Sequence, residues 1–387
     1  SLSADDHSAR LDRLLWIEAF TPAQRLLPEV SATTRILAEA RMSLARNEPG
    51  ADGIYARLAP ALRHDSGLMF ERLRWLRRKG QDGEAEKLLA APPKPLTRPE
   101  RWYAERSLLA RRAVTARRYA DAYRMISGHG LSEGGEFADG EFLAGWLALT
   151  KLKEPKKAGL HFGRLYLGVA LPISLARAAY WSGRAAATSG DRRLAEEWYR
   201  SAARHPTTYF GQQALAALGK PLPMLPPPPQ APAAARARFD ADELVRVVRL
   251  LAEAKASDVA GAFLFELGRR APDTTERVLA AELSIEAGRT RQAIAIAKRT
   301  LGLGEYLIGY DFPAFTLPEG VSGDLALVLA TTRQESGFEA EVVSSAGARG
   351  MMQLLPSTAR EVAQQIGRPL TGEAQLNDPA VNIRLGS

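Results

Sequence analysis

One glutamate stands where it could act as a proton donor. The apolar run after Asp324 predicts a single helix, and Gly337 predicts its end, because glycine suits a left-handed C-terminal residue. Glu335 then falls in the last turn, and helical spacing from Val328 and Thr332 places it on the apolar face. Burial and the negative end of the helix dipole both favour the protonated acid. A neutral carboxylic acid can protonate a glycosidic oxygen, the first requirement of glycosidic cleavage.

Glu335 could also be a surface residue with no catalytic role. A glutamate at the end of a surface helix often pairs with an arginine, and Arg333 is two residues away. The following residues favour the chemical interpretation, because 344–350 is a loop of small residues whose backbone can approach a ligand closely.

Residues 335–359 resemble the SLT domain of the lytic transglycosylases, which has a goose-type-lysozyme-like fold. The family pattern is an acidic residue with Ser, a Gly-Ala-x-Gly loop, an apolar residue with Met-Gln, and Pro-x-Thr-Ala. These elements occur here in order, as Glu335-Ser336, Gly347 to Gly350, Met351-Met352-Gln353 and Pro356 to Ala359. Residues 376–386 match the start of the family's next helix, and 178–185 and 206–211 resemble the superhelix of its soluble, Slt-type branch.

The resemblance implies cleavage of the β-1,4 bond between MurNAc and GlcNAc in peptidoglycan, with formation of 1,6-anhydro-MurNAc. Glu335 would be the single catalytic residue, first as acid and then as base. The residues that the resemblance assigns to glycan binding are Ser336, Ser344, Gly350, Met352 and Gln353. Neither a cofactor nor a metal is expected.

Three further glutamates have no special setting in the sequence. Glu339 and Glu341 are expected at the surface, as is Glu361 unless it forms a capping box with Thr358. A single carboxylate is enough for the implied reaction, so no second catalytic acid is assigned.

The elements that must position Glu335 are predicted to be helices throughout. Ala, Leu, Arg and Glu dominate, and apolar residues recur at steps of three and four, which predicts an all-α chain. Ala85, Ala122, Ala158 and Ala195 follow one another at steps of 37, 36 and 37 residues, close to the ~34-residue period of helix-turn-helix repeats. Such hairpins bury their apolar faces by stacking, so a helical-repeat superhelix is expected before the lysozyme-like SLT domain.

Prolines and glycines suggest the domain boundaries. Residues 1–220 are expected to form the α-superhelical domain, and 221–238 a proline-rich linker, because consecutive prolines exclude helix. Residues 239–323 return to helical spacing as a helical linker domain. Residues 324–387 are expected to be the N-terminal part of the SLT domain, with its C-terminal half absent. The segment is shorter than the ~70–80 residues at which a lone core is reliably stable. By the resemblance, one wall of the glycan groove would be absent, so residues 1–387 alone are expected to be inactive or nearly so, because both walls are needed to hold a sugar in reacting geometry.

Composition excludes several classes of function. The net charge of +8 is spread over scattered arginines, which argues against a nucleic-acid-binding protein. No apolar run approaches the ~20 residues of a membrane span, and the absence of cysteine excludes disulfides and thiol catalysis. The five histidines lack metal-ligand spacing. Tryptophans at 75, 146, 181 and 198 are interpreted as packing residues rather than sugar-stacking residues.

Location and activity each leave an alternative open. The first residues lack a signal-peptide pattern, so the protein is cytosolic or, as the resemblance implies, periplasmic with a removed signal peptide. Peptidoglycan glycan strands are the expected partner. The alternatives to a transglycosylase are a catalytically silent scaffold that binds peptidoglycan or a protein, and a lysozyme-type hydrolase.

Overall fold

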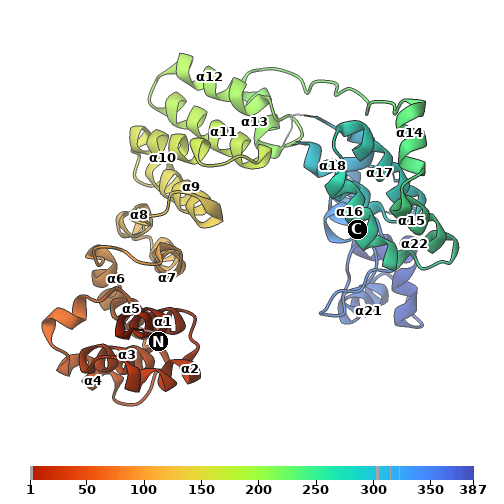
Figure 1. Cartoon of the computed structure of the whole chain (residues 1–387). Coiled ribbons are helices and arrows are strands. Elements are labelled where there is room, and N and C mark those ends of the chain that lie inside the picture. The colour runs from red at the N-terminus through yellow and green to blue at the C-terminus, as the bar shows by residue number, and fades with distance from the viewer. Residues whose placement is uncertain (1–2, 302–304, 314, 322) are drawn as a thin grey trace. The chain divides into compact units, whose positions relative to one another are not determined.

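The structure is a computed structural model that describes residues 3–301, 305–313, 315–321 and 323–387. Over these residues it is built from helices, and no strand forms beyond two isolated bridges near residues 343–354. The predicted all-α fold class is therefore confirmed. The chain divides into two compact units, Ser1–Leu222 and Pro223–Ser387, which are described separately (Figure 1).

The first unit is a series of helices joined by short turns. Its helices are α1 (Ala4–Trp16), α2 (Phe20–Arg25), η1 (Leu27–Glu29), α3 (Ala32–Ala45), α4 (Ala51–Arg57), η2 (Pro60–His64), α5 (Ser66–Arg78), α6 (Asp82–Ala90), α7 (Pro99–Thr115), α8 (Tyr119–Ser127), α9 (Gly134–Thr150), α10 (Pro155–Leu167), α11 (Pro172–Thr188), α12 (Arg192–Ala203) and α13 (Tyr209–Ala217). Successive helices pack on one another from α5 to α13, as stacked hairpins require.

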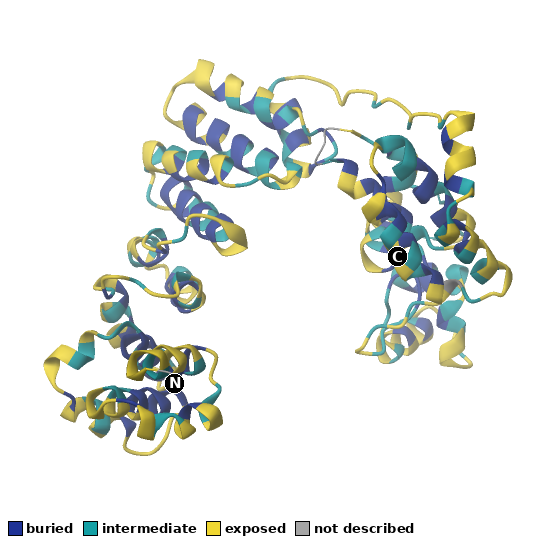
Figure 2. Ribbon diagram, viewed as in Figure 1, coloured by how far each residue is buried: buried dark blue, intermediate teal, exposed yellow. Residues whose placement is uncertain are grey.

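The predicted alanine positions lie where neighbouring helices approach most closely. Ala85, Ala122 and Ala158 are fully buried and Ala195 is 4% exposed. They lie on α6, α8, α10 and α12, the second helix of each pair. Gly145 serves the same purpose on α9, because a Cβ there would lie 2.6 Å from the Phe162 ring. Figure 2 shows that these helices turn one side inward and the other to solvent.

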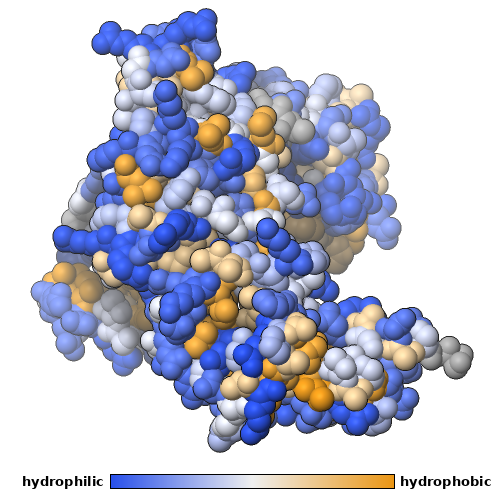
Figure 3. Space-filling view, turned by 90° about the vertical axis from the view of Figure 1, so that its left-hand side faces the viewer, coloured by the Kyte–Doolittle hydropathy of each residue, from blue (hydrophilic) through white to orange (hydrophobic). Residues whose placement is uncertain are grey.

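Aromatic side chains fill much of this core. Trp102 is completely buried and lies 5.7 Å from Phe70, whose ring is 5.1 Å from that of Trp16. Trp181 packs between Phe142 and Phe162. In Figure 3, the visible face is mainly hydrophilic with separate apolar patches, as expected where polar sides of helices face water.

The second unit contains the remaining helices. They are α14 (Ala233–Asp240), α15 (Glu243–Glu253), α16 (Ser257–Arg270), α17 (Thr274–Glu286), α18 (Thr290–Leu301), α19 (Ile308–Asp311), α20 (Leu325–Glu335), α21 (Pro356–Gln365), η3 (Glu373–Asn377) and α22 (Pro379–Gly386). Helix α14 begins inside the segment 221–238 that was expected to be a linker, because the prolines that exclude helix end at Pro232.

Two packed groups of helices make up this unit. Helices α14 to α18 share one core, in which Ala260 and Ala293, 33 residues apart in the sequence, are fully buried. Residues from α20 to α22 form smaller clusters around Met351, Met352 and Ile383. Among the described helices, none combines the length and the apolar character that crossing a bilayer requires.

Candidate active site

Helix α20 carries Glu335 in its last turn, as the sequence predicts. The Asp324 side chain begins the helix by accepting hydrogen bonds from the amides of Ala326 at 2.8 Å and Leu327 at 3.3 Å. Gly337 ends it with a φ of 64°, the left-handed conformation that glycine adopts most readily. The predicted position of the glutamate at a helix end is confirmed.

The predicted inward orientation of Glu335 is wrong, because its side chain is exposed. The buried row of α20 runs through Val328, Thr332 and Ser336 at steps of four residues. The hydroxyls of Thr332 and Ser336 each donate to the carbonyl four residues earlier along this row, at 2.9 Å and 3.2 Å. The buried residue at this end of the helix is therefore Ser336, whereas Glu335 points toward solvent.

The alternative pairing of Glu335 with Arg333 is also contradicted. Arg333 donates instead to Asp311, through Nε to the carbonyl oxygen at 2.7 Å and through Nη2 to the carboxylate. Among the residues that the structure describes, the Glu335 side chain makes no hydrogen bond or ion pair. Its carboxylate is thus available to a ligand.

The small-residue loop after α20 is held by its own polar groups. The Ser344 hydroxyl accepts from the Ala348 amide at 3.0 Å, and the Ser344 amide donates to the Ala348 carbonyl at 2.9 Å. The Gln353 side chain donates through Nε2 to the carbonyls of Val342 at 3.0 Å and Gly350 at 2.9 Å. Both side chains are half-buried and act at least partly in shaping the loop.

Gly350 and Met352 lie in the interior of the SLT segment. Gly350 has a φ of 76°, and a Cβ there would lie 2.1 Å from the Leu376 carbonyl oxygen, so only glycine fits. Met352 is 8% exposed, and a Cβ on Gly386 would lie 2.5 Å from its sulfur. The residues assigned to glycan binding are therefore half-buried (Ser344, Gln353) or buried (Ser336, Gly350, Met352), and that assignment stays a prediction.

Asn382 organises this region, and the sequence interpretation gave it no role beyond a motif match. Its side chain is completely buried. Its Nδ2 donates to the carbonyls of Arg349 and Leu376, both at 2.9 Å, and its Oδ1 accepts from the Met352 amide at 2.7 Å. The only available signal was its place within the matched segment 376–386.

The other glutamates differ in part from expectation. Glu339 is 7% exposed rather than at the surface, because it lies against Arg289, with 3.3 Å between the nearest nitrogen and oxygen. Burial raises the pKa of Glu339, and the nearby Arg289 opposes that rise. Glu341 is exposed as predicted. Glu361 is exposed too, but it forms no capping box with Thr358, because α21 begins at Pro356 and both residues lie inside it.

Two histidines of the first unit converge on a buried glutamate, which sequence spacing did not indicate. The Glu141 carboxylate, on α9, lies 3.2 Å from His129 Nε2 and 2.6 Å from His161 Nδ1, and it accepts from Arg164 Nε at 3.0 Å. Glu141 is 4% exposed. The described residues contain no cluster of three or more His, Cys, Asp or Glu side chains suited to a metal ion.

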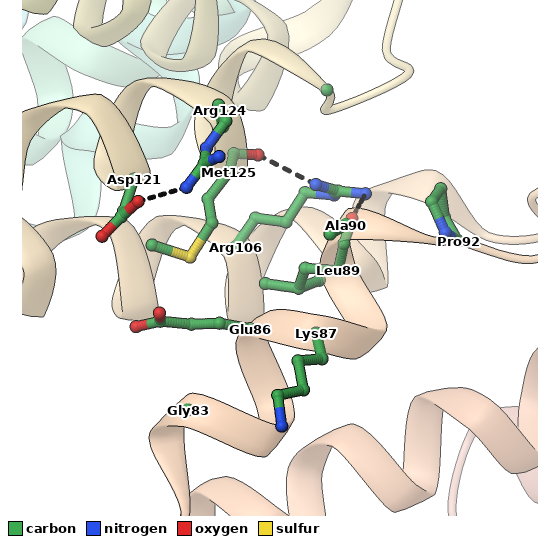
Figure 4. Close-up of a pocket in the computed structure, with 11 residues that line it drawn as sticks. Gly83, Glu86, Lys87, Leu89, Ala90, Pro92, Arg106, Asp121, Arg124 and Met125 are labelled. Carbon is green, nitrogen blue, oxygen red and sulfur yellow. Dashed lines mark hydrogen bonds and ion pairs between the residues drawn. The ribbon is translucent and has the colours of Figure 1, made fainter.

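Arg106 lines a cavity of about 440 Å³ in the first unit, where its side chain has a structural role (Figure 4). Arg106, on α7, is 1% exposed and donates to the carbonyls of Met125 at 2.9 Å and Leu89 at 3.2 Å. These carbonyls lie in the last turns of α8 and α6. One guanidinium group therefore donates hydrogen bonds to the C-terminal carbonyls of two helices, where the helix dipole is negative. Burial lowers the pKa of Arg106 to about 10.

Comparison with known proteins identifies the last part of the chain. Residues 319–387 match the transglycosylase SLT domain. A 59-residue stretch is 49% identical to a Haemophilus influenzae protein assigned to the soluble lytic murein transglycosylases, covering 15% of this chain and 10% of that protein. A 77-residue stretch is 35% identical to the soluble lytic murein transglycosylase of Salmonella typhimurium, covering 20% and 12%.

The fold of the whole chain is similar to a solved structure. The X-ray structure of an inactive glutamate-to-glutamine mutant of lytic transglycosylase Slt from Pseudomonas aeruginosa matches 100% of this chain with a TM-score of 0.76 and 20% identity. This chain spans 62% of the length of that one. The expected combination of a helical superhelix with an SLT domain is confirmed.

Proposed function

We propose that this chain cleaves the MurNAc-GlcNAc β-1,4 bonds of peptidoglycan glycan strands, because its residues 319–387 match the transglycosylase SLT domain. The observation that carries the proposal is the match to the SLT domain over a segment in which Glu335 is exposed, forms no ion pair with any described residue, and is followed in the chain by a loop of small residues. We further propose the periplasm as its compartment, since peptidoglycan lies there.

The proposed reaction uses Glu335 twice. Its carboxylic acid gives a proton to the oxygen between MurNAc and GlcNAc, and the C1–O bond breaks. The substrate's own N-acetyl group stabilises the positive charge that develops at C1. The carboxylate then takes the proton of the C6 hydroxyl, whose oxygen bonds to C1 and gives 1,6-anhydro-MurNAc. No water is consumed, and Glu335 ends the cycle protonated.

We predict that Glu335→Gln abolishes cleavage, because an amide cannot transfer the proton, while the fold and glycan binding remain. The measurement is the release of anhydro-muropeptides from purified sacculi by the full protein, followed by mass spectrometry. Glu341→Gln is the matched control, since Glu341 is also an exposed glutamate after α20. We expect it to keep full activity.

The same experiment separates the alternatives. A lysozyme-type hydrolase would give products heavier by one water, and a silent scaffold would bind sacculi without releasing sugars. The Slt structure from Pseudomonas aeruginosa is of a protein that a glutamate-to-glutamine change inactivates, which supports the choice of substitution. Substantial lysis by Glu335→Gln would rule out the assignment of this residue.

A further inference from the structure

Helix α20 is weakly held by the segment to which it belongs. Of its eleven residues, Val328 and Thr332 are buried. Leu325 and Leu327, near its start, are 55% and 66% exposed. A helix with so little packed surface gains little stability from tertiary contacts, yet a catalytic group must be held within about 0.5 Å of its productive position.

The last turn of α20 is fixed from one side by α19. Arg333, two residues before Glu335, donates to both the carbonyl and the carboxylate of Asp311, the last residue of α19. Asp311 is 1% exposed, and the Arg333 guanidinium lies 4.6 Å from the centre of the Phe312 ring. Two charge-assisted bonds from one planar group fix orientation as well as distance.

The chain just after α20 is fixed from another side by α18. Glu339, four residues after Glu335, accepts from the Arg291 amide at 3.3 Å and lies 3.3 Å from Arg289 Nη1. Arg291 is the second residue of α18, so the carboxylate lies at the positive end of that helix. Gly337 also packs closely against the start of α18, since a Cβ at Gly337 would lie 2.9 Å from the Cα of Arg291.

We propose that Asp311, Arg333, Glu339 and Arg289 are positioning residues for Glu335. Helices α18 and α19 hold the chain on both sides of the glutamate, two residues before it and four residues after it, and thereby set where its carboxylate stands. The helical segment before the SLT domain then takes part in catalysis and does more than connect domains. The inference rests on the proposed function of Glu335.

The test uses two substitutions that remove charge but keep size, Asp311→Asn and Glu339→Gln. We expect each to lower kcat at least tenfold with KM changed less than about threefold, since a misplacement of about 1 Å can cost ~100-fold in rate. Hydrogen exchange of amides in residues 331–341 should become faster, while that of α21 (356–365) stays unchanged.

Controls separate positioning from loss of fold. Glu266→Gln makes the same charge change in a solvent-exposed ion pair with Arg269 on α16 and should leave kcat unaltered. Circular dichroism melting shows whether each variant folds; if Glu339→Gln does not, Arg289→Gln removes the same ion pair at a partly exposed side chain. Folded variants with unchanged kcat, or with raised KM alone, would overturn the inference. If Glu335→Gln is inactive while these variants are fully active, the positioning role fails and the proposed function stands.

Discussion

Asn382, on α22, bonds through one side chain to two other stretches of the SLT segment, residues 349–352 and Leu376. It bonds the carbonyl of Arg349 in the loop after α20, the amide of Met352 and the carbonyl of Leu376. The bonds to Met352 and Leu376 are buried, so neither can readily be exchanged for a bond to water when the side chain is lost, and the bond to Arg349 is partly buried. The loop after α20 therefore depends on α22 for its shape.

We predict that Asn382→Ala lowers the free energy of unfolding of the second unit by about 2–4 kcal/mol, because it leaves buried carbonyl and amide groups without partners. Urea denaturation measures this change. Asn377→Ala is the matched control, since the Asn377 side-chain oxygen is buried without a hydrogen-bond partner. An equal loss of stability in both variants would contradict the role given to Asn382.

The sequence located the motif residues but not their surroundings. It gave the helix, its end at Gly337 and the glutamate in the last turn correctly. It placed both Glu335 and Ser336 on the buried face, although neighbouring residues on a helix point about 100° apart and packing buries only Ser336. The partners of Glu339 and Arg333 lie tens of residues upstream, where no local pattern could indicate them.

At the scale of helices, the regular spacing of alanines predicts the apolar contacts between neighbouring helices. It does not predict the buried contacts between polar side chains. Alanines at a regular period predict where helices meet, since close approach requires small residues. His129, Glu141 and His161 follow no such period and lie on a loop and two different helices. Their convergence joins α9 to α10 and to the turn after α8, so it helps to lock neighbouring repeats together.

The Glu141 cluster predicts how the first unit responds to acid. Burial alone would raise the pKa of Glu141, but hydrogen bonds from His129, His161 and Arg164 together hold it well below its ordinary value. A carboxylate with a lowered folded-state pKa contributes stability above its unfolded pKa, and the contribution is lost as pH falls below that value. We expect the stability of the first unit to decline from about pH 5 downward.

Glu141→Gln should flatten this decline and lower stability at pH 7 by about 3–5 kcal/mol, because it breaks a buried charged network. The measurement is the urea midpoint of the first unit between pH 3 and pH 7. Glu196→Gln is the control, since Glu196 pairs with Arg200 at an exposed site and should change stability by less than about 1 kcal/mol. An unchanged pH slope in Glu141→Gln would show that other groups set the acid response.

At the scale of the whole chain, the two compact units have separate cores. The clusters around Trp102, Phe162 and Ala179 lie wholly within residues 1–222, and the clusters around Leu264 and Met351 lie wholly within 223–387. The sequence predicts a boundary near residue 220 from its prolines, and both this boundary and the finer division of the second unit stay predictions. Prolines indicate a boundary because they exclude helix through local geometry, which can be read from the sequence. The contacts that Arg333 and Glu339 make with α19 and with the start of α18 join distant residues, and no local pattern indicates them.

We predict that residues 1–222 fold without the second unit, because stacked repeats gain their stability from their immediate neighbours. The fragment should melt in one cooperative transition by circular dichroism, within a few degrees of the same unit in the full chain. A fragment ending at residue 190 is the control: it removes α12 and α13 and exposes the face of α11 that buries Ala179 and Ala186. It should melt at a lower temperature, since a repeat without its partner loses its shared apolar surface. If both fragments melt alike, or if residues 1–222 do not fold, then the units depend on each other and the division at Leu222 does not mark independent stability.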